Sequence, residues 1–115
     1  MRISMDTALK TKRKYAKLQV LGYLGSKELL ENPEGIPLNC ITYVRKIILG
    51  IETAYKTISR SHNGEYKVKL IEDFFWNNNA RKPLYRLATD HYIHENTARA
   101  WINEFIDLVI QCIGM

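Results

Sequence analysis

The chain has 115 residues, of which 46% are hydrophobic and 25% charged, a composition that fits one folded domain and excludes a disordered segment. No apolar run approaches the roughly 20 residues that a membrane-spanning helix needs, and no apolar leader opens the sequence, so we expect a soluble cytoplasmic protein without a membrane partner. The net charge of +5 lies in residues 1–17, which hold six of the 17 basic residues and one of the 12 acidic ones.

The predicted first segment, residues 1–37, is a basic helix followed by a loop. Residues 5–31 are rich in helix-forming residues, with Ser4 as the N-cap and a break or bend expected near Gly22. Residues 32–37 contain two prolines and a glycine and therefore form a loop. An apolar line along the helix consists of Leu9, Ala16, Val20 and Leu24.

The basic residues of this segment suit contact with phosphates, because each Lys or Arg placed on a phosphate releases counterions. The alternative is a solvated helix face or a solubilising tail. The residues concerned are Lys10, Lys12, Arg13, Lys14 and Lys17.

Residues 38–79 are predicted to form a helical scaffold. Apolar residues recur in steps of three and four along a helix over residues 40–59, for which Asn39 can serve as the N-cap. The stripe is broad, so we expect it to pack against the chain's own helices, with a homodimer interface as the alternative. Its residues are Ile41, Val44, Ile48, Ile51, Tyr55 and Ile58.

A turn at residues 62–64 leads to a second scaffold helix. This helix is expected to end at residues 77–79, three asparagines whose short amides compete with helical hydrogen bonds. Its expected buried face comprises Tyr66, Leu70, Ile71, Phe74 and Phe75. Its expected solvent face comprises Lys67, Lys69, Glu72 and Asp73.

Residues 83–114 are predicted to form a helix-turn-helix, the two-helix motif with which many proteins enter the major groove of DNA. Pro83 suits the first position of the first helix, and Gly114 suits the end of the second. Residues 91–94 form the turn, where Ile93 would fill the corner between the helices. The inward residues of the second helix are expected to be Ala98, Trp101, Ile102, Phe105, Leu108, Val109 and Cys112.

The outward residues at the start of the second helix are those that would touch base edges. Arg can donate two hydrogen bonds to guanine, Asn can pair with adenine, and Glu can accept from the cytosine amine. The alternative is an ordinary helical hairpin with solvated charges. The candidate readers are His94, Glu95, Asn96, Arg99 and Asn103, and the candidate phosphate contacts beside them are Arg81, Lys82 and Arg86.

We expect no metal site, no cofactor and no enzymatic activity. His91 and His94 are three residues apart but lack the second ligand pair that a zinc site needs. The sequence has no Gly-rich phosphate loop, no nucleophile elbow and no HExxH pair. Cys40 and Cys112 lie on apolar faces, so we expect buried, reduced thiols, with a disulfide as the alternative.

Several stretches of residues 41–115 follow one pattern: an apolar helix that ends in an aromatic, then Leu-Ala, then a polar turn that leads to a small residue and a tryptophan. These stretches are Leu70–Trp76, Leu87–Ala88, Ile93–Trp101, Asn103–Ile106 and Ile113–Gly114. In them the chain resembles the RinA-like transcriptional regulators of bacteriophages and prophages, whose C-terminal half is similar to region 4 of sigma factors. His94 stands where that family has Ser, so we expect the loss of a good N-cap there, worth about 1 kcal/mol.

The resemblance implies a phage regulator in the cytoplasm of a bacterial host, which activates late genes by binding double-stranded DNA and the host RNA polymerase. We therefore expect a single all-α domain, residues 1–115, of four to five helices, that reads duplex DNA. Two alternatives stay open. One is a small terminase-like protein of DNA packaging, and the other is a module that docks on RNA polymerase with little DNA binding.

Overall fold

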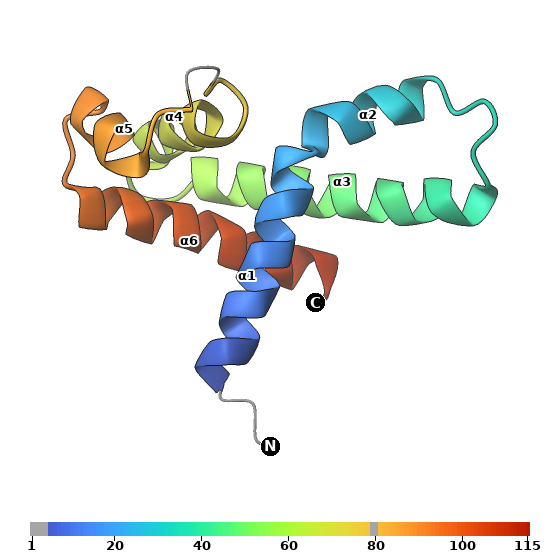
Figure 1. Ribbon diagram of the computed structural model, residues 1–115, viewed down its shortest axis with the longest axis horizontal. Helices are drawn as coiled ribbons and strands as arrows, with labels where there is room; N and C mark the ends of the chain where they lie inside the picture. Colours follow the sequence, from blue (N-terminus) through green and yellow to red (C-terminus); the bar gives the residue numbers. More distant parts are fainter. Residues whose placement is uncertain (1–4, 79–80) are drawn as a thin grey trace.

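The computed structural model describes residues 5–78 and 81–115, which form six α-helices and no strand (Figure 1). The all-α class is therefore confirmed. The helices are α1 (Met5–Leu21), α2 (Tyr23–Glu31), α3 (Leu38–Ser59), α4 (Gly64–Phe75), α5 (Leu84–Asp90) and α6 (Glu95–Ile113). Their number exceeds the expected four to five because a bend at Gly22 divides the first segment into α1 and α2. Across the described residues, no helix is both long and apolar enough to cross a membrane.

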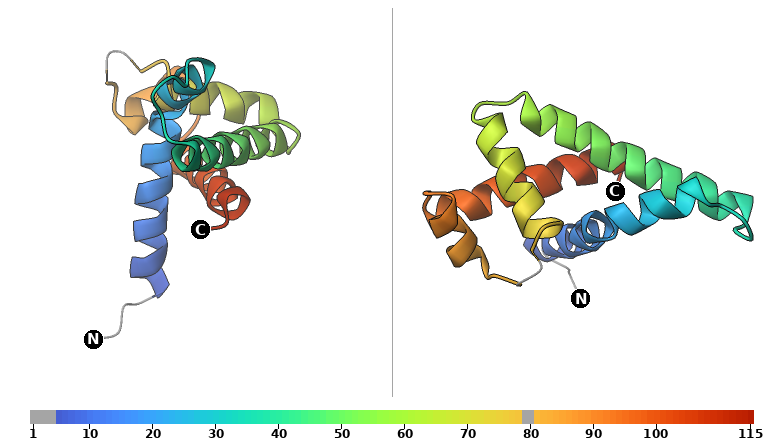
Figure 2. Two further views of the ribbon diagram at one scale, coloured as in Figure 1. Left: turned by 90° about the vertical axis from the view of Figure 1, so that its right-hand side faces the viewer. Right: turned by 90° about the horizontal axis from the view of Figure 1, so that it is seen from above.

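Helix α6 occupies the centre of the fold. It contacts α1, α3, α4 and α5, and its axis runs beside that of α3 (Figure 2). Helix α1 crosses α6, and its N-terminal half projects away from the other helices (Figure 1). Helix α2 packs on α3 but buries no residue completely.

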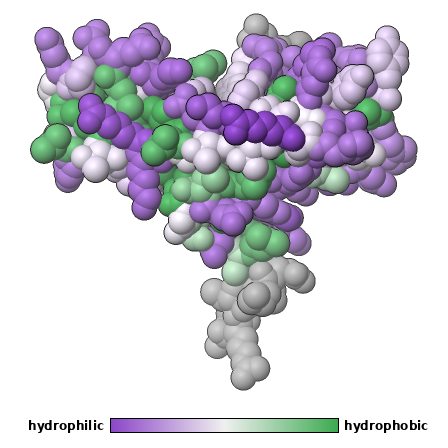
Figure 3. Space-filling model, turned by 180° about the vertical axis from the view of Figure 1, so that it is seen from behind, coloured by the Kyte–Doolittle hydropathy of each residue, from purple (hydrophilic) through white to green (hydrophobic). Residues whose placement is uncertain are grey.

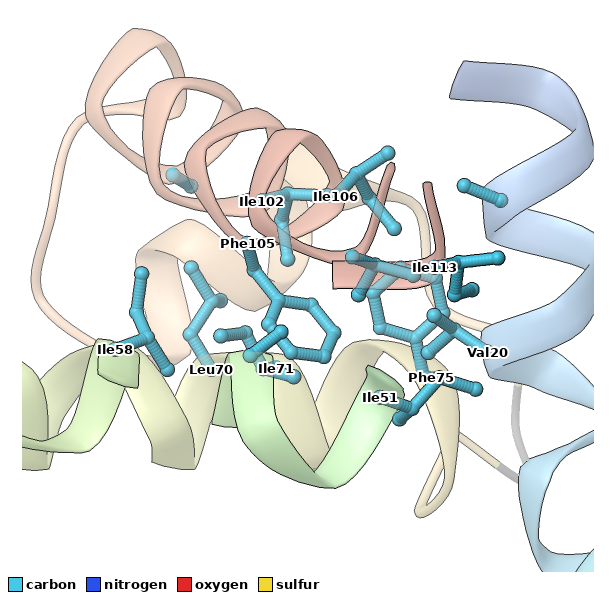
Figure 4. Packing of buried hydrophobic residues seen from close by; sticks show 14 of the residues in the cluster. Val20, Ile51, Ile58, Leu70, Ile71, Phe75, Ile102, Phe105, Ile106 and Ile113 are labelled. Carbon is cyan, nitrogen blue, oxygen red and sulfur yellow. The ribbon is translucent and has the colours of Figure 1, made fainter. Parts of the chain in front are cut away.

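The core forms where α3, α4 and α6 meet. Phe105 of α6 is fully buried and points toward Leu70 and Ile71 of α4 and Ile58 of α3, all of which are buried as well (Figure 4). From α1, Ala16 and Val20 reach the same cluster, whereas Leu9 and Leu24, the other two residues of the expected apolar line, are exposed. Burial of one such large side chain contributes about 1.5–3 kcal/mol, so this cluster is the main source of stability.

The stripe on α3 packs largely within the chain. Ile48, Ile51 and Ile58 are buried, whereas Ile41 and Val44 near the start of the helix are half-buried. Apolar surface gathers over the end of the molecule that α2 and the first half of α3 form, at the left of Figure 3. Its exposed apolar side chains include Leu29, Leu38, Tyr43 and Leu49.

The faces of α4 differ from the expectation at two positions. Lys67 is buried, at 7% exposure, while Tyr66 is exposed. The buried positions are Gly64, Lys67, Leu70, Ile71 and Phe75, which recur at helical spacing, so Lys67 takes the place expected for Tyr66 on an otherwise correctly predicted face. Lys67 fits because its ammonium reaches Glu104 Oε2 on α6 at 3.0 Å and donates to Ser61 Oγ at 3.2 Å.

The thiols and the inward face of α6 were also predicted incorrectly in part. Cys40 and Cys112 are free and exposed. Cys112 directly precedes Ile113, which is buried against Gly50 of α3, and neighbouring residues on a helix point about 100° apart, so Cys112 faces outward. Trp101 and Leu108 are half-buried, whereas Ile106 and Ile113 are buried although neither was assigned to the inward face. The buried face is broader than one stripe because α6 is covered from several directions.

Helix ends agree with the expectation at some positions. Gly114 ends α6 with a left-handed φ of 84°, as expected. Pro83 immediately precedes α5, and Asn39 lies inside α3, which begins at Leu38 after Pro37, so Asn39 is not its N-cap. Helix α4 ends at Phe75, two residues before the three asparagines. The expected contributions of Ser4 and Asn79 lie outside the described residues.

Gly50 permits the close approach of α3 to the end of α6. A Cβ atom at Gly50 would lie 2.6 Å from Ile113 Cγ1 and 3.3 Å from the backbone nitrogen of Ile113. Both distances are shorter than ordinary contacts, and the backbone atom cannot move without shifting the helix. The absence of a side chain at this position therefore sets the α3–α6 distance.

We expect Gly50→Ala to lower the free energy of unfolding by about 1–3 kcal/mol, because overpacking outweighs the better helix propensity of alanine. Gly25→Ala on α2 is the matched control, since its Cβ would meet nothing within 4 Å, and it should raise stability by up to about 1 kcal/mol. Urea denaturation measures both. Equal effects of the two variants would contradict the assigned role of Gly50.

Candidate nucleic-acid interface

Helices α5 and α6 are joined by the four residues 91–94. Tyr92 takes a left-handed φ of 58°, and the N–H of Ile93 donates to the carbonyl of Ala88 at 3.0 Å. Ile93 is half-buried and packs on the core, as expected for a residue that fills the corner. Ala88 and Ala98 are buried, at 2% and 0% exposure, so small side chains lie where the two helices approach.

The N-terminus of α6 is capped by a histidine. The Nδ1 atom of His94 accepts a hydrogen bond from the backbone N–H of Asn96 at 3.1 Å. The expected loss of the cap at His94 is therefore wrong, because an imidazole nitrogen replaces the serine hydroxyl as acceptor. One residue further, Glu95 Oε1 accepts from Arg99 Nη2 at 3.0 Å, which holds Arg99 along the helix.

A groove of about 460 Å³ separates α1 from the first half of α6. Five basic side chains line it, four from α1 and one from α6, and none of its described lining residues is acidic. Phe74, Leu84 and Ile102 contribute apolar parts of its wall. The polar lining residues are Lys10, Arg13, Lys14, Lys17, Arg99 and Asn103.

Helical spacing explains why α1 contributes so many of these side chains. Residues 10, 13, 14 and 17 are separated by three, four and seven positions, so they share one face of the helix. The adjoining face carries Ala16 and Val20, which are buried in the core. Packing of these two residues therefore turns the basic face toward α6.

A bidentate ion pair fastens α1 to α6. Arg13 Nε and Nη2 each donate to an oxygen of Asp107, at 2.8 Å in both cases. The hydrogen bonds that Arg13 donates to Asp107 raise the pKa of Arg13, so the guanidinium stays charged. Arg13 thus holds α1 in position in addition to lining the groove.

The structure brings together only some of the residues that the sequence singled out. Lys12 is exposed and is not among those that line the groove, and neither are Arg81, Lys82, Arg86, His94, Glu95 and Asn96. Lys82 Nζ pairs with Asp90 Oδ2 at 3.1 Å. The expected reading and phosphate-contacting residues therefore fall into two groups, one that lines the groove and one that does not.

Sequence patterns miss the link between α1 and α6, since Arg13 and Asp107 are 94 residues apart. Each of these residues looks like an ordinary solvated charge on its own helix. Within the described ranges, no group of three or more His, Cys, Asp or Glu side chains is arranged to hold a metal ion.

Comparisons of the chain with protein-family models, with curated proteins and with solved structures find no match in any of the three. The function is therefore inferred from the residues and geometry of the chain itself.

Asp107→Ala is expected to loosen α1. Both partners are partly exposed, so the loss of stability should be about 1 kcal/mol or less, but amide hydrogen exchange in residues 13–20 should become faster. Asp90→Ala, which removes the same charge from an exposed pair, is the control and should leave exchange in α1 unchanged. Unchanged exchange in both variants would show that Asp107 does not hold α1.

Proposed function

We propose that the protein is a DNA-binding transcription regulator of phage or prophage origin, in which α5 and α6 act as a helix-turn-helix. The observation that carries this proposal is the groove between α1 and α6, where four basic side chains of α1 face Arg99 and Asn103. The basic face of α1 and two of the five candidate readers thereby share one surface.

The chemistry of α6 suits the major groove of duplex DNA. Its first turns carry Glu95, Asn96, Arg99 and Asn103 outward from the core, and these side chains match the donor and acceptor patterns of cytosine, adenine and guanine. The pair between Glu95 and Arg99 keeps the guanidinium extended along the helix in the free protein. On DNA, Arg99 would exchange this partner for the O6 and N7 atoms of a guanine.

The chemistry of α1 suits phosphates. Lys10 and Lys14 are exposed and lie on the face that lines the groove, so a DNA strand beside α6 would pass within their reach. Such contacts position the protein and carry no sequence information. Arg81, Lys82 and Arg86, before and within α5, would contact the backbone on the other side of α6.

The resemblance of residues 41–115 to RinA-like regulators supports the same proposal and adds host RNA polymerase as a second partner. Late-gene activation would then follow from contact with both DNA and polymerase. A closed ring of many copies in solution would instead support DNA packaging as the function. DNA binding that is weak at every salt concentration would support docking on polymerase alone.

Lys14→Glu should weaken binding to duplexes of any sequence and lower the salt dependence by about 1 phosphate contact or more, because the substitution removes and reverses a phosphate-facing charge. Lys12→Glu is the matched control, since it changes the net charge equally on a side chain outside the groove. Fluorescence anisotropy between about 50 and 200 mM salt measures both. Equal losses would show only a general effect of charge.

Arg99→Ala should reduce the free energy of binding by about 1–3 kcal/mol for the duplex that the wild-type protein selects from a random pool, and by much less for a scrambled duplex. The control is Arg45→Ala, on the exposed part of α3, which should bind both duplexes as the wild type does. If Arg99→Ala loses the same affinity for both duplexes, Arg99 contacts a phosphate. If the pool yields no enriched sequence, the protein is not a sequence-specific reader.

A further inference from the structure

A second hollow, of about 390 Å³, lies among α2, α3 and the end of α4 and shares no lining residue with the basic groove. Three aromatic side chains form much of its wall: Tyr23, Tyr55 and Trp76. The ring centroids of Tyr23 and Tyr55 lie 5.4 and 6.3 Å from that of Trp76. The Nε1 atom of Trp76 donates to the carbonyl of Val20 at 2.8 Å, which holds the indole in place.

Two carboxylates and one lysine, Lys56, line the hollow beside these rings. The Tyr23 hydroxyl donates to Glu52 Oε2 at 3.0 Å, and the Tyr55 hydroxyl donates to Glu72 Oε1 at 2.5 Å. The hydrogen bond to Glu72, together with burial, raises the pKa of Tyr55 to about 12, so this phenol keeps its proton at neutral pH. Each carboxylate can accept about four hydrogen bonds, so both retain capacity for a ligand.

The chain's own Lys27 indicates what this wall attracts. Its Nζ atom lies 5.8 Å from the centroid of the Tyr23 ring and 3.7 Å from Glu52 Oε2. The Lys27 side chain is 51% exposed, so it sits at the rim. An aromatic face next to a carboxylate therefore already draws a cation at the edge of the pocket.

We infer that this pocket binds a guanidinium group. A guanidinium is planar, stacks on Trp and Tyr rings, and carries five N–H donors that can serve Glu52 and Glu72 together. An ammonium can lie over a ring, as that of Lys27 does, but it is strongly hydrated and lacks the planar set of five donors. A neutral aromatic ligand would stack on the rings, but it would displace water from two carboxylates without replacing the hydrogen bonds that the water makes.

The guanidinium can come from an arginine side chain of a partner protein or from a free arginine-like molecule. The pocket is independent of the proposed DNA surface, because its lining residues lie on α2, α3 and α4 and in the two residues after α4. Its test therefore needs no DNA, and failure of one proposal leaves the other intact.

The test uses the full chain with Trp101→Phe, which leaves Trp76 as the single tryptophan reporter. The probe is N-acetyl-arginine amide, followed by Trp76 fluorescence. The comparison probes are the matching citrulline derivative, which is neutral, and the lysine derivative. We expect saturable binding of the arginine probe and at least about tenfold weaker binding of both others.

Free arginine distinguishes the two sources. Equal binding of free arginine and the blocked amide supports a small-molecule ligand, whereas a clear preference for the blocked amide supports an arginine within a peptide. Absence of saturable binding by either, or equal binding of the lysine probe, overturns the proposal.

Glu72→Gln keeps an oxygen that accepts from the Tyr55 hydroxyl and removes the negative charge. It should therefore weaken binding of the arginine probe by about tenfold without unfolding the chain. Glu65→Gln, on the exposed first turn of α4, changes the net charge equally and should have no effect. Lys27→Gln removes the competing cation and should tighten binding a few-fold. If Glu72→Gln, folded as judged by circular dichroism, binds as tightly as Glu65→Gln, the assigned pocket is wrong.

Discussion

The burial of α6 against α3 is the constraint on which the other features of the fold depend. Phe105 is fully buried where α6 meets α3 and α4, and Ile113 can approach α3 closely because position 50 carries no side chain. Protein interiors are packed so closely that one added methyl group at such a point would displace the packed helices. Since the rest of α6 is held from several directions, its first turns are presented on a rigid support, as a binding surface requires.

Both candidate sites are consequences of how the other helices dock on this pair. Helix α1 is held by Ala16 and Val20 in the core and by the Arg13–Asp107 pair, and its basic face is thereby brought beside Arg99. The end of α4 closes the aromatic pocket through Trp76, whose hydrogen bond to Val20 ties the pocket to α1. Helix α1 thus connects the two surfaces physically, although the first is lined by basic side chains and the second contains two carboxylates.

Helical periodicity predicted the positions of the helices and most of the core, because a stripe of apolar residues needs no knowledge of its partner. It misjudged Lys67 and Tyr66, since a lysine can bury its stem once a distant acceptor such as Glu104 is within reach. It also placed Cys112 inside, because periodicity does not tell from which direction a partner helix covers the last turn of α6, where Ile113 rather than Cys112 is buried. The sequence also suggested that the N-cap of α6 is lost at His94, but a nitrogen of the His94 ring serves as the cap.

The secondary structure, the turn at residues 91–94 and the uneven distribution of charge can be read from neighbouring residues, because they depend on interactions within one or two helical turns. The groove and the aromatic pocket could not be read in this way. Arg13 meets Asp107 and Tyr23 meets Trp76 only after the helices dock, and docking depends on side-chain volume at a few close contacts such as Gly50. Burial of separate segments against one another, rather than any local pattern, decides which charges and rings share a surface.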